Sequence, residues 1–189
     1  MNTQSTDRRV RRTKKLLLQG LTQLLSQKKI NKITVKELTE LVDVNRATFY
    51  LYYKDIFDML DQIENEMFEN FSEALAKYNS KGVTKDNSLS FFTFIFEYVQ
   101  EYADMCKILL GPDGDYSFVE KLKAIIKTTF LPPIDSKITK IKGQYFMPFV
   151  ISGCIGTIQQ WLEADMKPEP KAMAEFVVEV IVNSSNVSM

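Results

Sequence analysis

Apolar residues in this chain recur with the period of a helix. From Arg8 onward, valine and leucine return at spacings of three, four and seven residues, which places them on one face of an amphipathic helix. Similar patterns follow along the chain, and glycine and proline are too scarce for a turn-rich β fold. After the helix that starts at Arg8, the predicted helices span about residues 34–43, 46–53, 55–78, 88–110, 116–130, 138–166 and 171–183. With the long helix over 138–166 expected to bend near Pro148, these eight segments predict an all-α chain of about nine helices, with three N-terminal helices followed by a C-terminal helical bundle.

Local signals define several of these boundaries. Thr34 precedes the second helix and Glu37 follows three residues later, the pattern of a capping box. Asn45 is the expected cap of the third helix. Residues 111–115 form a strong turn signal, and the prolines at 132–133 should end the helix before them. Two short helices joined by a three-residue turn, after a longer first helix, predict a helix-turn-helix at about residues 34–53.

The net charge is zero, but the charges are unevenly distributed. Residues 1–54 hold 12 Lys/Arg and 4 Asp/Glu, a net charge of +8, and residues 55–189 hold the remaining 12 Lys/Arg and 20 Asp/Glu, a net charge of −8. The basic part suits a polyanion, because each neutralised phosphate releases counterions, although a solvated basic face would look the same. Many of its cations lie in the first turns of the first helix, where the helix dipole disfavours them. We therefore expect phosphate contacts there, from Arg11 and Arg12.

Several classes of function lack the residues they need. The chain has no histidine, which excludes Ser-His-Asp and Cys-His catalytic pairs and histidine-ligated metals. Glycine-rich phosphate loops are also missing. We predict no enzyme, no cofactor and no metal site. The two cysteines, Cys106 and Cys154, fall in apolar helical patterns and are expected to be buried reduced thiols. Without a signal peptide or a membrane-length apolar run, the expected location is the cytoplasm.

The start of the third predicted helix carries side chains suited to reading DNA. In a helix-turn-helix, the second short helix presents its N-terminal residues to base edges in the major groove. Arg46 can pair with a guanine edge or a phosphate, Thr48 can contact a base or a thymine methyl, and Ala47 allows close approach. Amide groups at the N-termini of the second and third helices can hold phosphates, assisted by Thr34 and Lys36.

The sequence of this region resembles the DNA-binding domain of the TetR family of bacterial regulators. The match runs through residues 33–38 (ITVKEL), 44–50 (VNRATFY) and 53–55 (YKD), and covers roughly residues 8–68. In that family the residue opening the second helix, the third helix with its tyrosine, and a following lysine contact DNA. The resemblance thus implies DNA contacts from Thr34, Asn45, Arg46, Thr48, Tyr50 and Lys54. Phe49 takes the family's buried core position, and residues 69–189 would form a second domain for dimerisation and effector binding.

Two residues depart from the family pattern. Asp43 stands in the turn where glycine is usual, and aspartate tolerates the left-handed conformation better than most residues. Ile56 stands where a lysine is common. Either one phosphate contact is lost there, or Ile56 joins the core.

The C-terminal part resembles the same family more weakly, from residue 149 to the region of Phe176. In the family, the last two helices pack against their copies as a four-helix dimer interface. The resemblance implies an interface that includes Gly153, Gly156, Trp161 and Phe176. Family members often hold an effector between these helices, which gives a possible pocket for an apolar or aromatic small molecule, although these aromatics could equally be core. The pocket residues would be Phe92, Phe96, Tyr102, Phe118, Tyr145, Phe149 and Trp161.

Together these features predict a sequence-specific DNA-binding regulator. The expected form is a ligand-responsive repressor that binds a palindromic operator in double-stranded DNA as a homodimer. The alternative is a TetR-like adaptor or co-regulator that acts through protein contacts, with weak or no DNA binding. Asp43 and Ile56 are the residues that favour this alternative.

Overall fold

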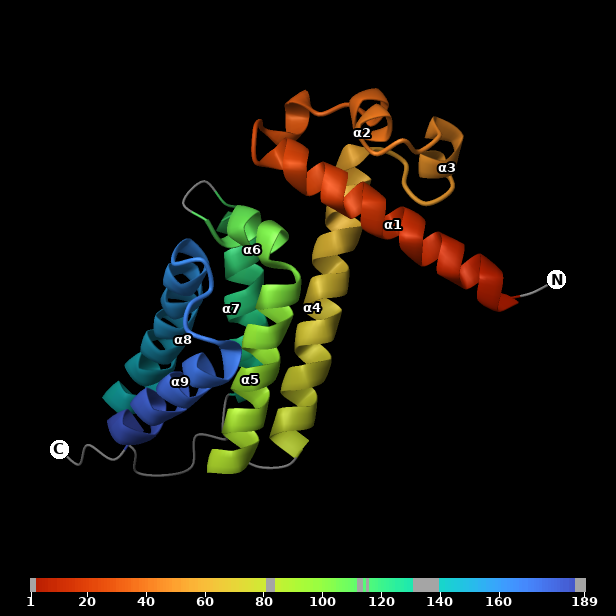
Figure 1. Ribbon diagram of the computed structural model, residues 1–189. Helices are drawn as coiled ribbons and strands as arrows, with labels where there is room; N and C mark the ends of the chain where they lie inside the picture. Colours follow the sequence, from red (N-terminus) through yellow and green to blue (C-terminus); the bar gives the residue numbers. More distant parts are fainter. Residues whose placement is uncertain (1–2, 81–83, 112–113, 115, 131–139, 186–189) are drawn as a thin grey trace. The chain divides into compact units, whose positions relative to one another are not determined.

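The described part of the chain is entirely helical. The computed structural model describes residues 3–80, 84–111, 114, 116–130 and 140–185, and within these ranges the chain forms nine α-helices and one short 3-10 helix (Figure 1). The helices are α1 (Thr3–Leu25), η1 (Ile30–Lys32), α2 (Val35–Leu41), α3 (Arg46–Tyr50), α4 (Ile56–Ser80), α5 (Lys85–Glu101), α6 (Ala103–Leu110), α7 (Tyr116–Phe130), α8 (Lys140–Glu163) and α9 (Pro170–Ser185). The predicted all-α fold is confirmed. The proline signal at 132–133 lies outside the described residues.

The chain divides into two compact units, residues 1–66 and residues 67–189. The first unit has its own core beneath the predicted helix-turn-helix. One face of α1 packs against α2, and α2 packs against α3. The side chains at the centre of this core are buried, and they are Leu17, Leu21, Leu24, Ile33, Leu38, Phe49, Tyr53, Ile56 and Met59. Burial of these apolar surfaces holds the two short helices, which would be marginal as isolated peptides.

The N-terminus of α2 is capped by one half of the predicted capping box. Thr34 Oγ1 accepts a hydrogen bond from the Glu37 N–H at 3.2 Å. The Glu37 carboxylate does not return a bond to the Thr34 amide in the described structure. It accepts from Lys28 Nζ instead, at 2.5 and 2.6 Å. The reciprocal half of the prediction is therefore wrong, because Lys28, in the turn after α1, offers this carboxylate a charged donor.

The turn between α2 and α3 has the conformation that its aspartate permits. Asp43 adopts a φ of 51°, in the left-handed region. The Val44 N–H then donates to the Thr39 carbonyl at 2.9 Å, which closes the turn. Asn45 caps α3 as predicted, and its Oδ1 accepts from the Ala47 N–H at 2.7 Å. The helix ends at Tyr50, three residues before the predicted end.

The second unit contains α5 to α9 and the part of α4 from residue 67 onward. α9 packs along α5, and α6 contacts both α7 and α8. Trp161 is 2% exposed, its ring meets the Phe96 ring edge-on at 5.1 Å, and its Nε1 donates to the Pro168 carbonyl at 2.6 Å. This tryptophan therefore ties α8 to α5 and to the segment before α9. None of the described helices combines the length and the apolar character needed to cross a bilayer.

One predicted helix of this unit is wrong in its extent. The helix expected over 88–110 is two helices, α5 and α6, separated at Tyr102 (φ −109°, ψ 29°). The apolar spacing continues through the break, so periodicity alone does not reveal it. Thr84, rather than Ser88, caps α5, with its side chain accepting from the Asn87 N–H. By contrast, α7 has the predicted bounds, and α8 remains helical through Pro148.

Candidate functional site

The short helix α3 is held in the core by an apolar side chain on one face and exposes its polar residues on the others. Phe49 is fully buried, and its ring packs against Tyr53 at 5.5 Å. On the other sides Asn45, Arg46 and Ala47 are exposed, and Thr48 is half-buried. Tyr50 is 51% exposed and meets the Phe49 ring edge-on. The residues predicted to read DNA are thus presented together by a helix that is fixed from below.

The other predicted contacts of the helix-turn-helix are exposed around α3. Thr34 accepts its capping bond through Oγ1, which leaves the hydroxyl proton able to donate outward. Lys36 lies one turn from Glu40, with Nζ 3.8 Å from the carboxylate, an exposed pair of little energetic weight. Lys54 is exposed, and its backbone N–H donates to Asp58 at the start of α4. Lys36 and Lys54 can both turn toward a phosphate at small cost.

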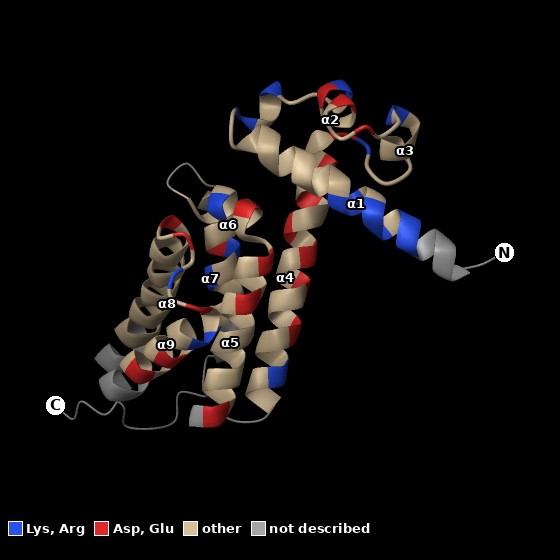
Figure 2. Cartoon of the chain, in the orientation of Figure 1, with Lys and Arg blue, Asp and Glu red and all other residues tan. Residues whose placement is uncertain are grey.

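Basic residues are concentrated in the described N-terminal part of α1, coloured blue in Figure 2. The four arginines and two lysines here are all exposed: Arg8, Arg9, Arg11, Arg12, Lys14 and Lys15. Lys14 Nζ lies 5.9 Å from the centre of the Tyr53 ring, within cation–π range. This surface offers positive charge within the same unit as α3.

Ile56 joins the core instead of leaving an empty phosphate site. It is 3% exposed, beside Tyr53 and Met59. Burial, together with the nearby Glu66 and Asp58 carboxylates, raises the pKa of Tyr53 to about 12. Of the two roles open to Ile56 from the sequence, the structure assigns the packing role.

An apolar cavity of about 390 Å³ lies inside the second unit. Five helices contribute to its wall, including Leu75 of α4, Ile95 of α5, Ile126 of α7, Ile158 of α8 and Val178 of α9. Almost the whole lining is aliphatic or aromatic, and the cavity has the size of a small-molecule site. Cys154 also faces it, and burial raises the pKa of this thiol to about 11.

The structure does not gather the predicted pocket aromatics around this cavity. Phe92 lines it, but the other six predicted residues do not. Phe96, Phe118 and Trp161 are buried in packing contacts, and the Tyr102 ring lies tilted against the Tyr98 ring, 4.7 Å away, at the end of α5. The lining residues that sequence reasoning missed are mainly aliphatic, and their helical spacing is the same as that of ordinary core.

Tyr145 and Phe149 lie instead on an exposed face of α8. Tyr145 is 61% exposed and Phe149 is 69% exposed. Gly153 and Gly156 follow at helical spacing, and a Cβ added to either glycine would meet nothing within 4 Å. Phe176, on α9, is 52% exposed. Of the predicted interface residues only Trp161 is inaccessible. We call the exposed residues Tyr145, Phe149, Gly153, Gly156 and Phe176 the α8–α9 face.

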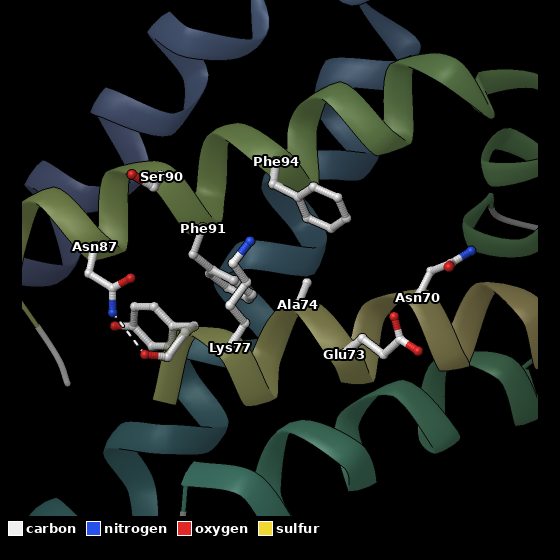
Figure 3. A pocket seen from close by; sticks show the side chains of 9 residues that line it. Asn70, Glu73, Ala74, Lys77, Asn87, Ser90, Phe91 and Phe94 are labelled. Atoms are coloured by element: carbon white, nitrogen blue, oxygen red, sulfur yellow. Dashed lines mark hydrogen bonds between the residues drawn. The ribbon is translucent and has the colours of Figure 1, made fainter. Parts of the chain in front are cut away.

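A second pocket of about 490 Å³ lies between α4 and α5 and is lined by both polar and aromatic side chains; we call it the polar pocket, because it contains the charged residues that the apolar cavity lacks (Figure 3). It contains an acid and a base from α4, Glu73 and Lys77, and two amides, Asn70 and Asn87. Asn87 Nδ2 donates to the Tyr78 carbonyl at 2.8 Å, which links the two helices. Sequence patterns do not reveal this pocket, because its polar residues are spaced like those of any solvated helix face.

The sequence is similar to those of known transcriptional regulators. A family model described as the C-terminal region of a transcriptional regulator, of TetR type, matches residues 86–183, which is more than half of the chain. A curated relative is an uncharacterized HTH-type transcriptional regulator, YxbF of Bacillus subtilis (strain 168), with 25% identity over 172 residues. The match covers 86% of this chain but 43% of the relative, so the chain spans less than half the length of that protein.

Solved structures share the fold over nearly the whole chain. A TetR transcriptional regulator from Streptococcus agalactiae 2603V has a TM-score of 0.57 at 20% identity, covering 95% of this chain and 99% of its own. A TetR-family regulator from Bordetella parapertussis 12822 has a TM-score of 0.67 at 12% identity, covering 94% and 98%. FadR from Bacillus subtilis, solved with stearoyl-CoA, has a TM-score of 0.58 at 18% identity, covering 88% and 96%. The chain belongs to the TetR family of transcriptional regulators.

Proposed function

We propose that this regulator binds a specific DNA sequence through α3, with α1 and the start of α2 holding the phosphate backbone. The observation that carries the proposal is the presentation of α3, where Asn45, Arg46, Ala47 and Tyr50 are exposed above the buried Phe49. A helix that is anchored in this way loses little conformational entropy on binding, so its side chains can select among base edges.

Phosphate contacts would supply much of the affinity. The exposed cations of α1, together with Lys36 and Lys54, belong to the same unit as α3. Neutralising several phosphates releases counterions and makes binding strongly dependent on salt. Ile56 takes no part in this grip, because it is buried in the core.

The proposed active form is a homodimer that binds a palindromic operator. One recognition helix covers one half-site, and a two-fold dimer presents two of them about 34–36 Å apart, on successive turns of the duplex. The α8–α9 face supports the dimer, because its aromatic side chains are exposed and its glycines leave room for a partner helix to approach.

The apolar cavity supports the further proposal that a ligand controls DNA binding. FadR of Bacillus subtilis, which shares the fold, was solved with stearoyl-CoA. In this chain an apolar effector would fill the 390 Å³ cavity, whose wall includes helices α4 to α9 except α6. A ligand that favours a conformation with low DNA affinity would release the operator, so the proposed sign of regulation is repression.

A mobility-shift assay with the DNA upstream of the protein's own gene tests DNA binding. Arg46→Ala and Tyr50→Ala should each weaken the shift by about ten-fold or more, the range expected for one lost base contact. Lys171→Ala, at an exposed position of α9, is the control that should leave the shift unchanged. Wild-type affinity should fall steeply as salt increases.

The adaptor alternative gives a different result in the same assay. An adaptor would show no shift at moderate salt, or a weak shift that neither Arg46→Ala nor Tyr50→Ala changes. The two residues that favoured it from the sequence both have structural roles, Asp43 as the left-handed residue of the turn and Ile56 as core.

A further inference from the structure

The apolar cavity and the polar pocket share a wall. Tyr78 of α4 and Phe91 of α5 line both of them. Both side chains are largely buried, at 6% and 9% exposed, and their rings lie in contact with centroids 4.8 Å apart. The Tyr78 hydroxyl shares a hydrogen bond of 3.1 Å with Ser88 Oγ. The side chains of Tyr78 and Phe91 therefore belong to the walls of both spaces.

The two sides of this shared wall differ in chemistry. On one side the lining is hydrocarbon, with Leu75 and Ile151 among its members. On the other side, the pocket between α4 and α5 presents Asn70, Glu73 and Lys77. A molecule that occupied both would gain from burying an apolar chain in the first and from keeping a polar group hydrogen-bonded in the second.

Lys77 indicates which charge the polar group of such a molecule would carry, because a cation in the pocket favours an anion. No ion pair joins Lys77 to a carboxylate among the residues described, although Glu73 lies one helical turn away. Lys77 lines this pocket together with Tyr78 and Phe91 and directly precedes Tyr78 in α4, whereas Glu73 lies one helical turn earlier, toward Asn70 (Figure 3). The cation is thus the charged group beside the shared wall.

We propose that the cavity and the pocket form one binding site for a single-chain amphipathic carboxylate. The alkyl chain lies in the apolar cavity and passes the shared wall at Tyr78 and Phe91, and the carboxylate binds Lys77 in the polar pocket. Entry of the chain displaces one of the two rings, since their centroids lie only 4.8 Å apart. This inference rests on the proposed effector function and names the chemical class of the effector.

Equilibrium dialysis of the full-length chain tests the head-group preference. The probes are radiolabelled decanoic acid, 1-decanol and decylamine, which share one chain length and differ in head group. At pH 8 the acid is ionised, and it should bind about ten-fold more tightly than the alcohol, because a charge-assisted hydrogen bond to an ammonium is stronger than a neutral one. Decylamine should bind more weakly than decanoic acid.

Three substitutions test which residue causes the preference for decanoic acid over 1-decanol. Lys77→Gln should remove the advantage of the acid over the alcohol and leave alcohol binding unchanged. Glu73→Gln removes the competing carboxylate from the pocket and should increase the advantage of the acid. Lys171→Gln, which removes an exposed charge from α9, is the matched control and should change neither affinity. All three positions are exposed, so the variants should fold.

The outcomes separate this inference from the function on which it rests. If acid and alcohol bind equally, and Lys77→Gln changes neither, the two-part site is wrong while an apolar effector in the cavity stands. If none of the three probes binds at any concentration below its solubility limit, both the two-part site and the effector cavity are overturned.

Discussion

At the scale of single residues, Gly20 is the position where α1 leaves room for α2. A Cβ at this buried position would collide with Val42 Cγ1 and lie 2.9 Å from Leu38 Cδ1. Alanine is preferred over glycine in a helix by about 1 kcal/mol, but overpacking a core costs about 1–3 kcal/mol. Val42 is β-branched and has few rotamers to which it can retreat. The steric cost should therefore exceed the gain in helix propensity.

We expect Gly20→Ala to lower the free energy of unfolding by about 1 kcal/mol, the difference between these two effects. Urea denaturation followed by circular dichroism measures it. The same change in a Val42→Ala background should be neutral or stabilising, because the colliding methyl group is gone. A cost that is equal in both backgrounds would show that this contact does not limit the packing of α1 on α2.

Tyr53 predicts how stability responds to alkaline pH. Burial raises its pKa from 10.0 to about 12, so the folded state favours the neutral phenol. The unfolded state releases this proton first, and the stability contributed by Tyr53 is complete below pH 10 and is lost as the pH rises to about 12. Tyr53→Phe should flatten the fall in stability over this interval. Parallel urea titrations from pH 9 to 12 provide the comparison, and identical slopes for the two proteins would contradict it.

At the scale of elements, the sequence predicts where helices form better than it predicts what each face of a helix packs against. Caps such as Asn45 are local, because the side chain bonds an amide two residues away, so a short motif identifies them. The family resemblance places Tyr145 and Phe149 in an effector pocket, but in the structure they lie on an exposed face of α8. Periodicity places residues on one face of a helix. It does not say whether that face meets a cavity, the core or solvent, which depends on tertiary packing.

The start of α4 shows the same dependence on packing, in adjacent residues. Ile56 is 3% exposed and Phe57 is 56% exposed. Ile56→Lys would bury an ammonium in the core and should lower the free energy of unfolding by several kcal/mol. Phe57→Lys should change it by less than about 0.5 kcal/mol, as surface substitutions usually do. Thermal unfolding of both variants tests this. An Ile56→Lys variant as stable as wild type would show that position 56 is not part of the core, so that a lysine there could reach solvent and a phosphate.

At the scale of the whole molecule, charge is divided between the two parts of the chain. The basic residues 1–54 would attract the phosphates of DNA. The acidic remainder of the chain would repel them. A single basic unit, however, covers only one half-site. The proposed operator binding would therefore depend on joining two copies, and the α8–α9 face, with its exposed aromatic side chains, is the surface that we propose for that role.

Gly156→Arg separates dimerisation from folding. A Cβ at this position meets nothing within 4 Å, and arginine is a better helix former than glycine by up to about 1 kcal/mol, so the isolated chain should be at least as stable. A large cation on the α8–α9 face should nevertheless prevent close approach of a second copy. Sedimentation analysis at micromolar concentration should therefore give a dimer for wild type and a monomer for Gly156→Arg.

Ala124→Arg, at an exposed position of α7, is the control for this experiment and should remain dimeric. Loss of the dimer should also weaken operator binding by about 100-fold or more, because two linked half-sites bind far more tightly than one. A wild-type chain that sediments only as a monomer, or a Gly156→Arg variant that remains dimeric, would place the interface elsewhere or remove it.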